Sequence, residues 1–144
     1  IVRGSAQEPD EVVWQALKIG YDTLAGELAG GMPAWIAAGE ATSQIPLVSA
    51  ESVGDAAVLD VRQASEFTAG HIPGAHHVEL GDLPTRADAA PAGSAVVMCG
   101  HGERAMSAAT LLVRCGKADV AVMPGGADAW SAATGRPLQV GACA

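Results

Sequence analysis

The sequence predicts an α/β protein of three layers, in which helices cover both faces of a five-stranded parallel sheet. Short apolar runs rich in β-branched residues alternate with segments of helical periodicity, a pattern typical of parallel sheets with crossover helices. The run Ala95–Met98 suits a strand that is buried on both faces. Cys99 and a glycine-containing loop follow it, so a thiol stands at the carboxyl end of a strand, where open parallel sheets bind ligands.

Composition narrows the class of protein. The chain has 144 residues and 49% of them are hydrophobic, which is enough to bury a core, while only 3% are aromatic. The net charge of −8 argues against nucleic acid and anionic membrane surfaces as partners. No apolar run approaches the ~18 residues of a membrane span, and no secretory signal pattern is present.

The three cysteines, Cys99, Cys115 and Cys143, have an odd count and no metal-ligand spacing. We therefore expect a reducing, cytoplasmic setting with one working thiol, no metal and no other cofactor. His76 and His77 are adjacent, so in a strand they face opposite ways and do not easily share a metal. Because the first residue is Ile rather than Met, we also expect a fragment or a processed product.

Breaker residues and apolar spacing place the elements of residues 43–144. Pro73 and Gly74 exclude regular structure from the loop Gly70–Gly74, and Gly116 ends the helix that starts at Arg104. The predicted strands are Ile45–Val48, Ala56–Val61, His76–Glu79, Ala95–Met98 and Val120–Met123. The predicted helical segments are Ser49–Val53, Ala64–Thr68, Leu80–Arg86, the stretch after Arg104, and Ala127–Thr134.

Residues 1–42 carry a shorter set of elements. Asp10 is a suitable N-cap for a helix that ends at Ile19, before Gly20. We predict a strand at Thr23–Leu28 and a helix at Met32–Ala38. The small, polar stretch Gly39–Gln44 is typical of a linker.

Part of this segment is similar to the end of the chain. Leu28–Gly39 parallels Met123–Gly135 at an offset of 95 residues, and both contain Gly-Gly-x-x-Ala-Trp. Gly20 pairs with Gly116 at an offset of 96, and extending that register sets Arg3 beside Cys99. Either two helix starts are alike by chance in an Ala/Gly-rich chain, or residues 1–42 are the last third of a preceding module.

The position of Cys99 favours a reactive thiol over the alternative of a buried structural cysteine. Only about 3% of a free cysteine is thiolate at pH 7. A helix amino terminus stabilises a nearby anion by ~0.3–1 kcal/mol, which is not enough alone. Loop N–H groups, Arg104 and His101 would have to supply the rest.

The loop Cys99–Arg104 (Cys-Gly-His-Gly-Glu-Arg) resembles the active-site loop of rhodanese-type sulfurtransferases. Further blocks of that family follow its order over Pro46–Pro137: Leu59–Arg62, Glu66–Phe67, Gly70–Ala75, Pro124–Gly126 and Trp130. The resemblance implies a complete rhodanese-like domain at residues 43–144. It also implies that Cys99 carries a sulfane sulfur as a persulfide, from thiosulfate or a persulfide donor to a thiol or cyanide. Related dual-specificity phosphatases have one more residue in this loop.

The resemblance also implies roles for the neighbouring residues. The loop positions Gly100, His101, Gly102, Glu103 and Arg104 would bind substrate, with Arg104 shaping the loop and holding an anionic donor. His101 either touches substrate or faces solvent. We expect Glu103 to cap the following helix and to disfavour small dianions. The supporting pair Asp60 and Arg62 would tie loops around the site, and His71 would fix its own loop.

The other cysteines and the first segment complete the hypotheses. Cys115 is predicted to be structural, and Cys143 to lie in a mobile tail or to resolve Cys99 through a disulfide. A non-catalytic, degenerate module at residues 1–42 resembles part of a tandem rhodanese fused to a metallo-β-lactamase-like hydrolase. The alternative function is then a sulfur carrier or regulatory module serving that hydrolase. Exposed apolar residues in residues 1–42 would pack on the second module or join two copies in a homodimer.

Overall fold

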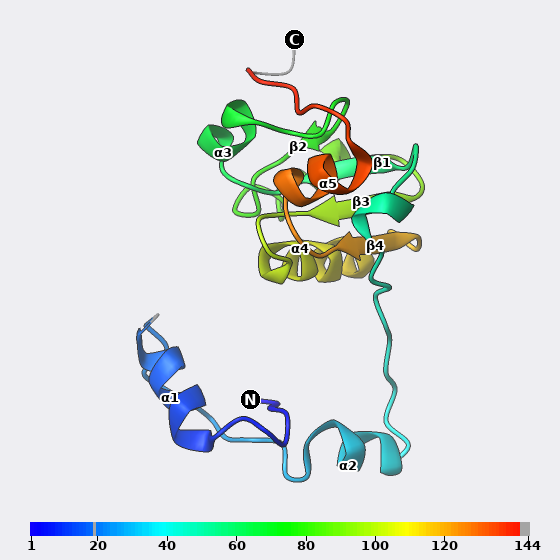
Figure 1. Ribbon diagram of the computed structural model, residues 1–144. Helices are drawn as coiled ribbons and strands as arrows, with labels where there is room; N and C mark the ends of the chain where they lie inside the picture. Colours follow the sequence, from blue (N-terminus) through cyan, green and yellow to red (C-terminus); the bar gives the residue numbers. More distant parts are fainter. Residues whose placement is uncertain (19, 142–144) are drawn as a thin grey trace. The chain divides into compact units, whose positions relative to one another are not determined.

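The computed structural model describes residues 1–18 and 20–141 (Figure 1). The chain forms two compact units, Ile1–Gln44 and a second unit that starts at Ile45. Ile19, the predicted end of the first helix, and Cys143 lie outside the described residues. None of the helices in the described part of the chain is long and apolar enough to cross a membrane.

The second unit is built on a parallel sheet of four strands in the order β2-β1-β3-β4. The strands are β1 (Ala57–Asp60), β2 (His76–His77), β3 (Ala95–Met98) and β4 (Val120–Met123). Asp60 pairs with Met98, and Met98 with Met123, so the three longer strands end level with one another. Cys99 therefore leaves the sheet at its carboxyl edge, between the segments that follow β1 and β4.

The prediction of a fifth strand at Ile45–Val48 is wrong. Leu47 forms a single parallel bridge with Val122 beside β4. Pro46 accepts a hydrogen bond from Val122 N–H, and Val48 donates one to the Val122 carbonyl. Because Pro46 has no N–H to donate, the pairing does not extend towards the amino end of this segment.

Helices cover both faces of the sheet, as the alternation predicted (Figure 1). On one face, α4 (Glu103–Arg114) packs through Ala105, Ala108, Ala109 and Leu112. The other face is covered by α3 (Ala64–Ala69), α5 (Ala127–Thr134) and the 3-10 turn η1 (Ala50–Ser52). Alternating strand residues divide between the two cores, with Leu59 and Val97 in the first and Val58 and Val96 in the second.

The segment between β2 and β3 differs most from its prediction. Residues 80–85 form consecutive turns rather than the predicted helix over 80–86, and a 3-10 turn, η2 (Ala87–Ala89), follows. Pro84 lacks a donor and restricts the residue before it, and Gly81 lowers helix propensity. β2 is also shorter than the predicted His76–Glu79, because pairing with β1 ends at His77.

The first unit contains α1 (Pro9–Lys18) and α2 (Gly31–Ala37), near the two predicted helices. The strand predicted at Thr23–Leu28 is absent from the described residues. Ile1 instead makes one pairing there, since its terminal amine donates to Gly26 O at 2.8 Å and its carbonyl accepts from Leu28 N–H at 2.9 Å. No residue of α1 or α2 is buried.

Some backbone features of the first unit match those near the end of the second unit. Gly20 and Gly116 have φ of 89° and 88°, and Gly30 and Gly125 have φ of 73° and 86°. Ile1 lies opposite the segment between Gly26 and Leu28, just as Val97 pairs in parallel with Val122. The next glycines of the two segments differ, because Gly31 has φ of 59° whereas Gly126 has φ of −101°, so the two helix starts are not the same.

Candidate active site

Cys99 is the first residue of the loop that joins β3 to α4, and its side chain is buried. Its Sγ accepts a hydrogen bond from the backbone N–H of Gly102 at 3.1 Å. Gly102 has φ of +128°, which side-chain-bearing residues rarely adopt, so glycine is needed to turn this N–H towards the sulfur. A buried sulfur that faces a donor and a helix amino terminus is suited to carry negative charge.

The turn that follows β4 packs against the backbone of the Cys99 loop. Gly125 N–H donates to the His101 carbonyl at 3.3 Å. A β-carbon on Gly126 would lie 3.1 Å from the Gly100 carbonyl oxygen and 3.4 Å from that of Cys99. The Gly125–Gly126 turn after β4 therefore supports the backbone on which Cys99 stands.

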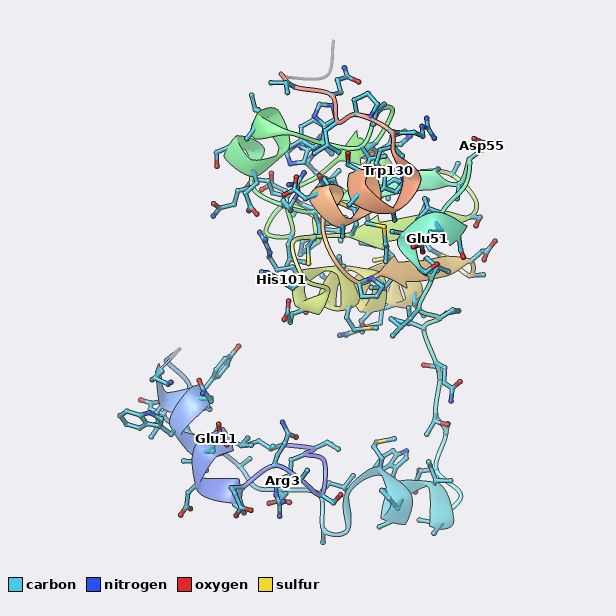
Figure 2. All side chains as sticks on the ribbon, in the orientation of Figure 1. Arg3, Glu11, Glu51, Asp55, His101 and Trp130 are labelled. Carbon is cyan, nitrogen blue, oxygen red and sulfur yellow. The ribbon has the colours of Figure 1, made fainter. Side chains whose placement is uncertain are left out.

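The side chains of His101 and Glu103 are exposed, and Figure 2 labels His101 at the surface of the loop. Glu103 is not the N-cap residue of α4, because Gly102 holds that position and no side-chain cap hydrogen bond is present there. Glu103 is the first residue of the helix, where its charge still meets the positive end of the dipole.

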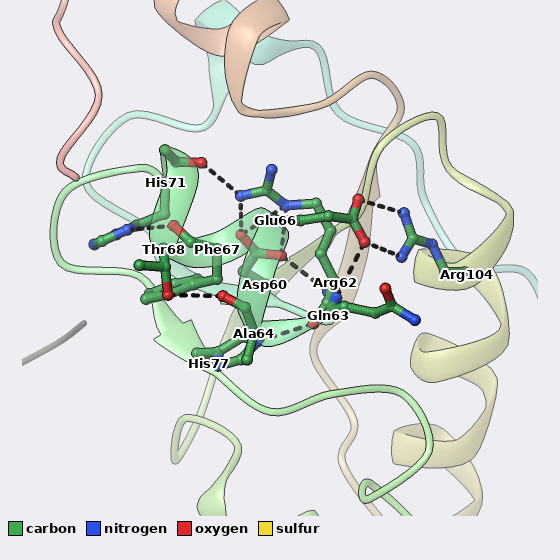
Figure 3. A network of polar contacts seen from close by, with 11 residues as sticks. Asp60, Arg62, Gln63, Ala64, Glu66, Phe67, Thr68, His71, His77 and Arg104 are labelled. Carbon is green, nitrogen blue, oxygen red and sulfur yellow. Dashed lines mark hydrogen bonds and ion pairs between the residues drawn. The ribbon is translucent and has the colours of Figure 1, made fainter. Parts of the chain in front are cut away.

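Arg104 is held by Glu66, a residue of α3 to which the sequence analysis gave no role (Figure 3). Its Nη1 and Nη2 donate to the two Glu66 carboxylate oxygens at 2.7 and 2.9 Å. The hydrogen bonds from Arg104 lower the pKa of Glu66 from 4.5 to about 2. The same bonds raise the pKa of Arg104 above its usual range, and a smaller contribution comes from Cys99. The Arg104 guanidinium thus lies close to Cys99 Sγ, while its Nη1 and Nη2 atoms are both bonded to Glu66.

One sequence pattern, a capping box, assigns Glu66 a role at the start of α3. Gln63 and Glu66 form a capping box, in which Gln63 N–H donates to a Glu66 oxygen at 3.2 Å. That pattern predicts the start of α3 but not the ion pair, because Arg104 is 38 residues away in sequence. Only the parallel order of β1 and β3 brings α3 beside the start of α4.

Asp60 and Arg62 form a buried pair at the end of β1 (Figure 3). Arg62 Nε donates to both Asp60 oxygens at 3.0 Å, and Nη2 donates to Asp60 Oδ2 at 2.6 Å and to the Gly70 carbonyl at 2.8 Å. The pair joins the strand end to the loop after α3. His71 is also buried, stacks on Phe67 and bonds to its carbonyl through Nδ1 at 2.9 Å.

The remaining candidates lie away from this loop. Cys115 is exposed at the C-cap of α4, so the prediction that it packs as a structural cysteine is wrong; it lies one residue beyond the end of the helix. His76 is exposed, whereas the His77 ring stacks on Phe67. Within residues 1–18 and 20–141, no group of three or more His, Cys, Asp or Glu side chains could hold a metal ion.

Comparisons with known proteins agree with this arrangement. Residues 47–133 match the model of the rhodanese-like domain family. Thiosulfate sulfurtransferase GlpE of Pseudomonas putida is 41% identical over 81 residues, which is 54% of this chain and 71% of that protein. The GlpE of Pseudomonas fluorescens is 40% identical over 79 residues, 52% of this chain and 70% of that protein.

Solved structures show the same fold. The rhodanese-like domain of an Anabaena protein is 31% identical with a TM-score of 0.57, over 67% of this chain and 80% of that one. A rhodanese-related protein from Thermoplasma volcanium has a TM-score of 0.59 at 23% identity, over 66% of this chain and 98% of that one. The family match covers more than half of the chain and includes the cysteine loop, the Asp60–Arg62 pair and the Gly125–Gly126 turn. This chain therefore belongs to the rhodanese-like domain family.

Proposed function

We propose that the chain is a sulfurtransferase in which Cys99 carries a sulfane sulfur from thiosulfate or a persulfide donor to a thiol or cyanide. The observation that carries the proposal is the hydrogen bond from Gly102 N–H to Cys99 Sγ, at the carboxyl edge of the sheet. The family and the likeness to GlpE support sulfur transfer in general. The identity of the sulfur donor and of the acceptor belongs to our proposal.

The transfer runs in two displacements without net oxidation. The Cys99 thiolate attacks the outer sulfur of thiosulfate, a new S–S bond forms, and the donor S–S bond breaks with its electron pair leaving on sulfite. The acceptor thiolate or cyanide then attacks the terminal sulfur of the Cys99 persulfide. That step releases a persulfide or thiocyanate and regenerates the thiolate.

The residues around Cys99 fit these steps. Gly102 N–H and the amino terminus of α4 stabilise the negative sulfur before and after each displacement. Burial of Cys99 shields the persulfide from water and stray thiols. Arg104, next to the sulfur, fixes the shape of the loop through its bonds to Glu66.

The mass of the protein after exposure to thiosulfate tests this function. We expect a gain of one sulfur atom that Cys99→Ser abolishes. Cys115→Ser is the matched control, because Cys115 is an exposed thiol on the opposite end of α4 and should leave the gain unchanged. A sulfur adduct that persists in Cys99→Ser would refute the assignment.

A sulfur carrier with little turnover of its own is the second candidate, and it is favoured by the matching conformations of Gly20 with Gly116 and of Gly30 with Gly125. In this proposal residues 1–42 are the end of a degenerate rhodanese-like module, with Arg3 in the place of Cys99. The tandem would serve a fused metallo-β-lactamase-like hydrolase. Steady-state turnover with thiosulfate and cyanide separates the candidates, since a carrier loads one sulfur and then stops.

A further inference from the structure

Both arginines near the Cys99 loop are paired with carboxylates, although the site would accept an anionic sulfur donor. Arg104 gives both ends of its guanidinium to Glu66, and Arg62 is bound to the buried Asp60. Glu103 adds an exposed carboxylate in the first turn of α4. Each guanidinium near the loop is therefore neutralised, and one further negative charge stands beside the loop.

The Arg104–Glu66 pair is also placed where it can affect a donor. A β-carbon on Gly100 would lie 3.4 Å from Arg104 Nη2, so the guanidinium is next to the loop backbone. The side chains of Arg104 and Glu66 are 38% and 36% exposed, so a molecule at the loop would meet both charges. An anion that approaches Arg104 must compete with the carboxylate already bound to it.

We propose that Glu66 determines donor selectivity: by neutralising Arg104 beside Cys99, it disfavours dianionic donors such as thiosulfate relative to donors of lower charge. This inference rests on the proposed sulfur transfer through Cys99 and names the donor class that the site selects against. Glu66 is a specificity-determining residue that acts through Arg104. Glu66→Gln should release the positive charge while its amide oxygen still accepts one guanidinium hydrogen bond.

Alkylation of Cys99 tests the electrostatic part without any sulfur transfer. Iodoacetate and iodoacetamide are nearly equal in size but differ by one negative charge, so the ratio of their rates cancels the barrier to reaching the buried sulfur. In a Cys115→Ser background, with Cys99 followed by peptide mass, Glu66→Gln should raise the iodoacetate-to-iodoacetamide ratio about threefold or more. The increase should shrink as salt is added.

Two variants control this measurement. Glu66→Asp keeps the negative charge and should leave the ratio near that of the wild type. Asp55→Asn removes one carboxylate before β1, at the opposite end of that strand from the loop, and should also leave it unchanged (Figure 2 labels Asp55 and His101). An equal rise in Asp55→Asn would mean that total charge, and not Glu66, sets the ratio.

Steady-state kinetics test the donor class. Thiosulfate carries two negative charges and benzenethiosulfonate carries one, so Glu66→Gln should raise kcat/KM about tenfold for the first and about threefold for the second. If no variant turns over any donor, the proposed function fails, while the alkylation ratio still decides the role of Glu66. If sulfur loads normally but Glu66→Gln leaves both the ratio and the donor preference unchanged, the selectivity proposal is overturned.

Discussion

Gly126→Ala should damage the Cys99 loop without touching the loop itself. Gly126 has an ordinary extended backbone, with φ of −101° and ψ of −169°, so alanine meets no conformational strain there. Its added β-carbon would lie 3.1 Å from the Gly100 carbonyl oxygen and 3.5 Å from Gly100 Cα. The backbone around Cys99 must therefore retreat by a few tenths of an ångström.

The size of the effect follows from that displacement. Overpacking of this kind costs about 1–3 kcal/mol, and each kcal/mol lowers the Tm of a domain of this size by roughly 4–8 °C. Misplacing reacting groups by 1 Å can cost about a hundredfold in rate, so a shift of a few tenths of an ångström should slow sulfur loading about fourfold. The reason is that Gly102 N–H no longer meets Cys99 Sγ at 3.1 Å.

Single-turnover loading from thiosulfate, followed by mass, measures the rate, and thermal unfolding measures stability. Gly81→Ala is the matched control, because a β-carbon there would meet nothing within 4 Å and its φ is not positive. If Gly126→Ala loads sulfur at the wild-type rate although its Tm has fallen, the turn after β4 supports the fold but not the geometry of Cys99.

Four further predictions follow from the pairs and from the first unit. Arg104→Ala should slow loading at least tenfold in the same assay, yet cost only ~0.2–1 kcal/mol by denaturant unfolding, because its pair with Glu66 is half-exposed. The lowered pKa of Glu66, about 2 in the folded state against 4.5, stabilises the protein above about pH 4.5, and this contribution is lost as pH falls towards 2. The Tm difference between wild type and Glu66→Gln should therefore shrink from pH 7 to pH 3. Asp60→Asn leaves Arg62 buried beside a neutral amide and should cost about 3–5 kcal/mol by denaturant unfolding; a loss below ~1 kcal/mol would contradict the buried-pair argument. Limited proteolysis should leave residues 1–42 intact longer than a disordered tail, and rapid digestion with no change in the size of the remainder would contradict their folding.

The strands of the sheet could be predicted where a segment's own residues form an apolar run. Ala95–Met98 and Val120–Met123 are uninterrupted apolar runs, and both are strands with the predicted bounds. Predictions failed where partners decide the outcome. Ile45–Val48 has strand-like residues but a proline next to Leu47, its one bridged residue, and Thr23–Leu28 pairs through its backbone with Ile1 without forming a strand. A strand forms only where neighbouring strands accept and donate its backbone hydrogen bonds, and the residues of one segment do not reveal those partners.

The candidate site divides in the same way. Cys99, Arg104 and the glycines that shape the loop are contiguous, so their spacing alone suggested a cysteine held by backbone N–H groups. Glu66 and Gly126 come from other elements and reach the loop only because β1, β3 and β4 lie side by side. The residues proposed here to tune the site are thus the ones that sequence spacing could not assign.

The two copies of Gly-Gly-x-x-Ala-Trp show how much the same short sequence depends on its surroundings. Gly30 and Gly125 both adopt positive φ before a helix, but Gly31 has φ of 59° where Gly126 has φ of −101°. Trp130 is 2% exposed because it packs with Val53, Val58 and their neighbours, whereas Trp35 is 38% exposed. The described residues of the first unit contain no counterpart of η1, β1 or α3, the elements that supply this cover in the second. The same short sequence therefore precedes a helix in both units, while its tryptophan is buried only in the second unit, where these elements cover it.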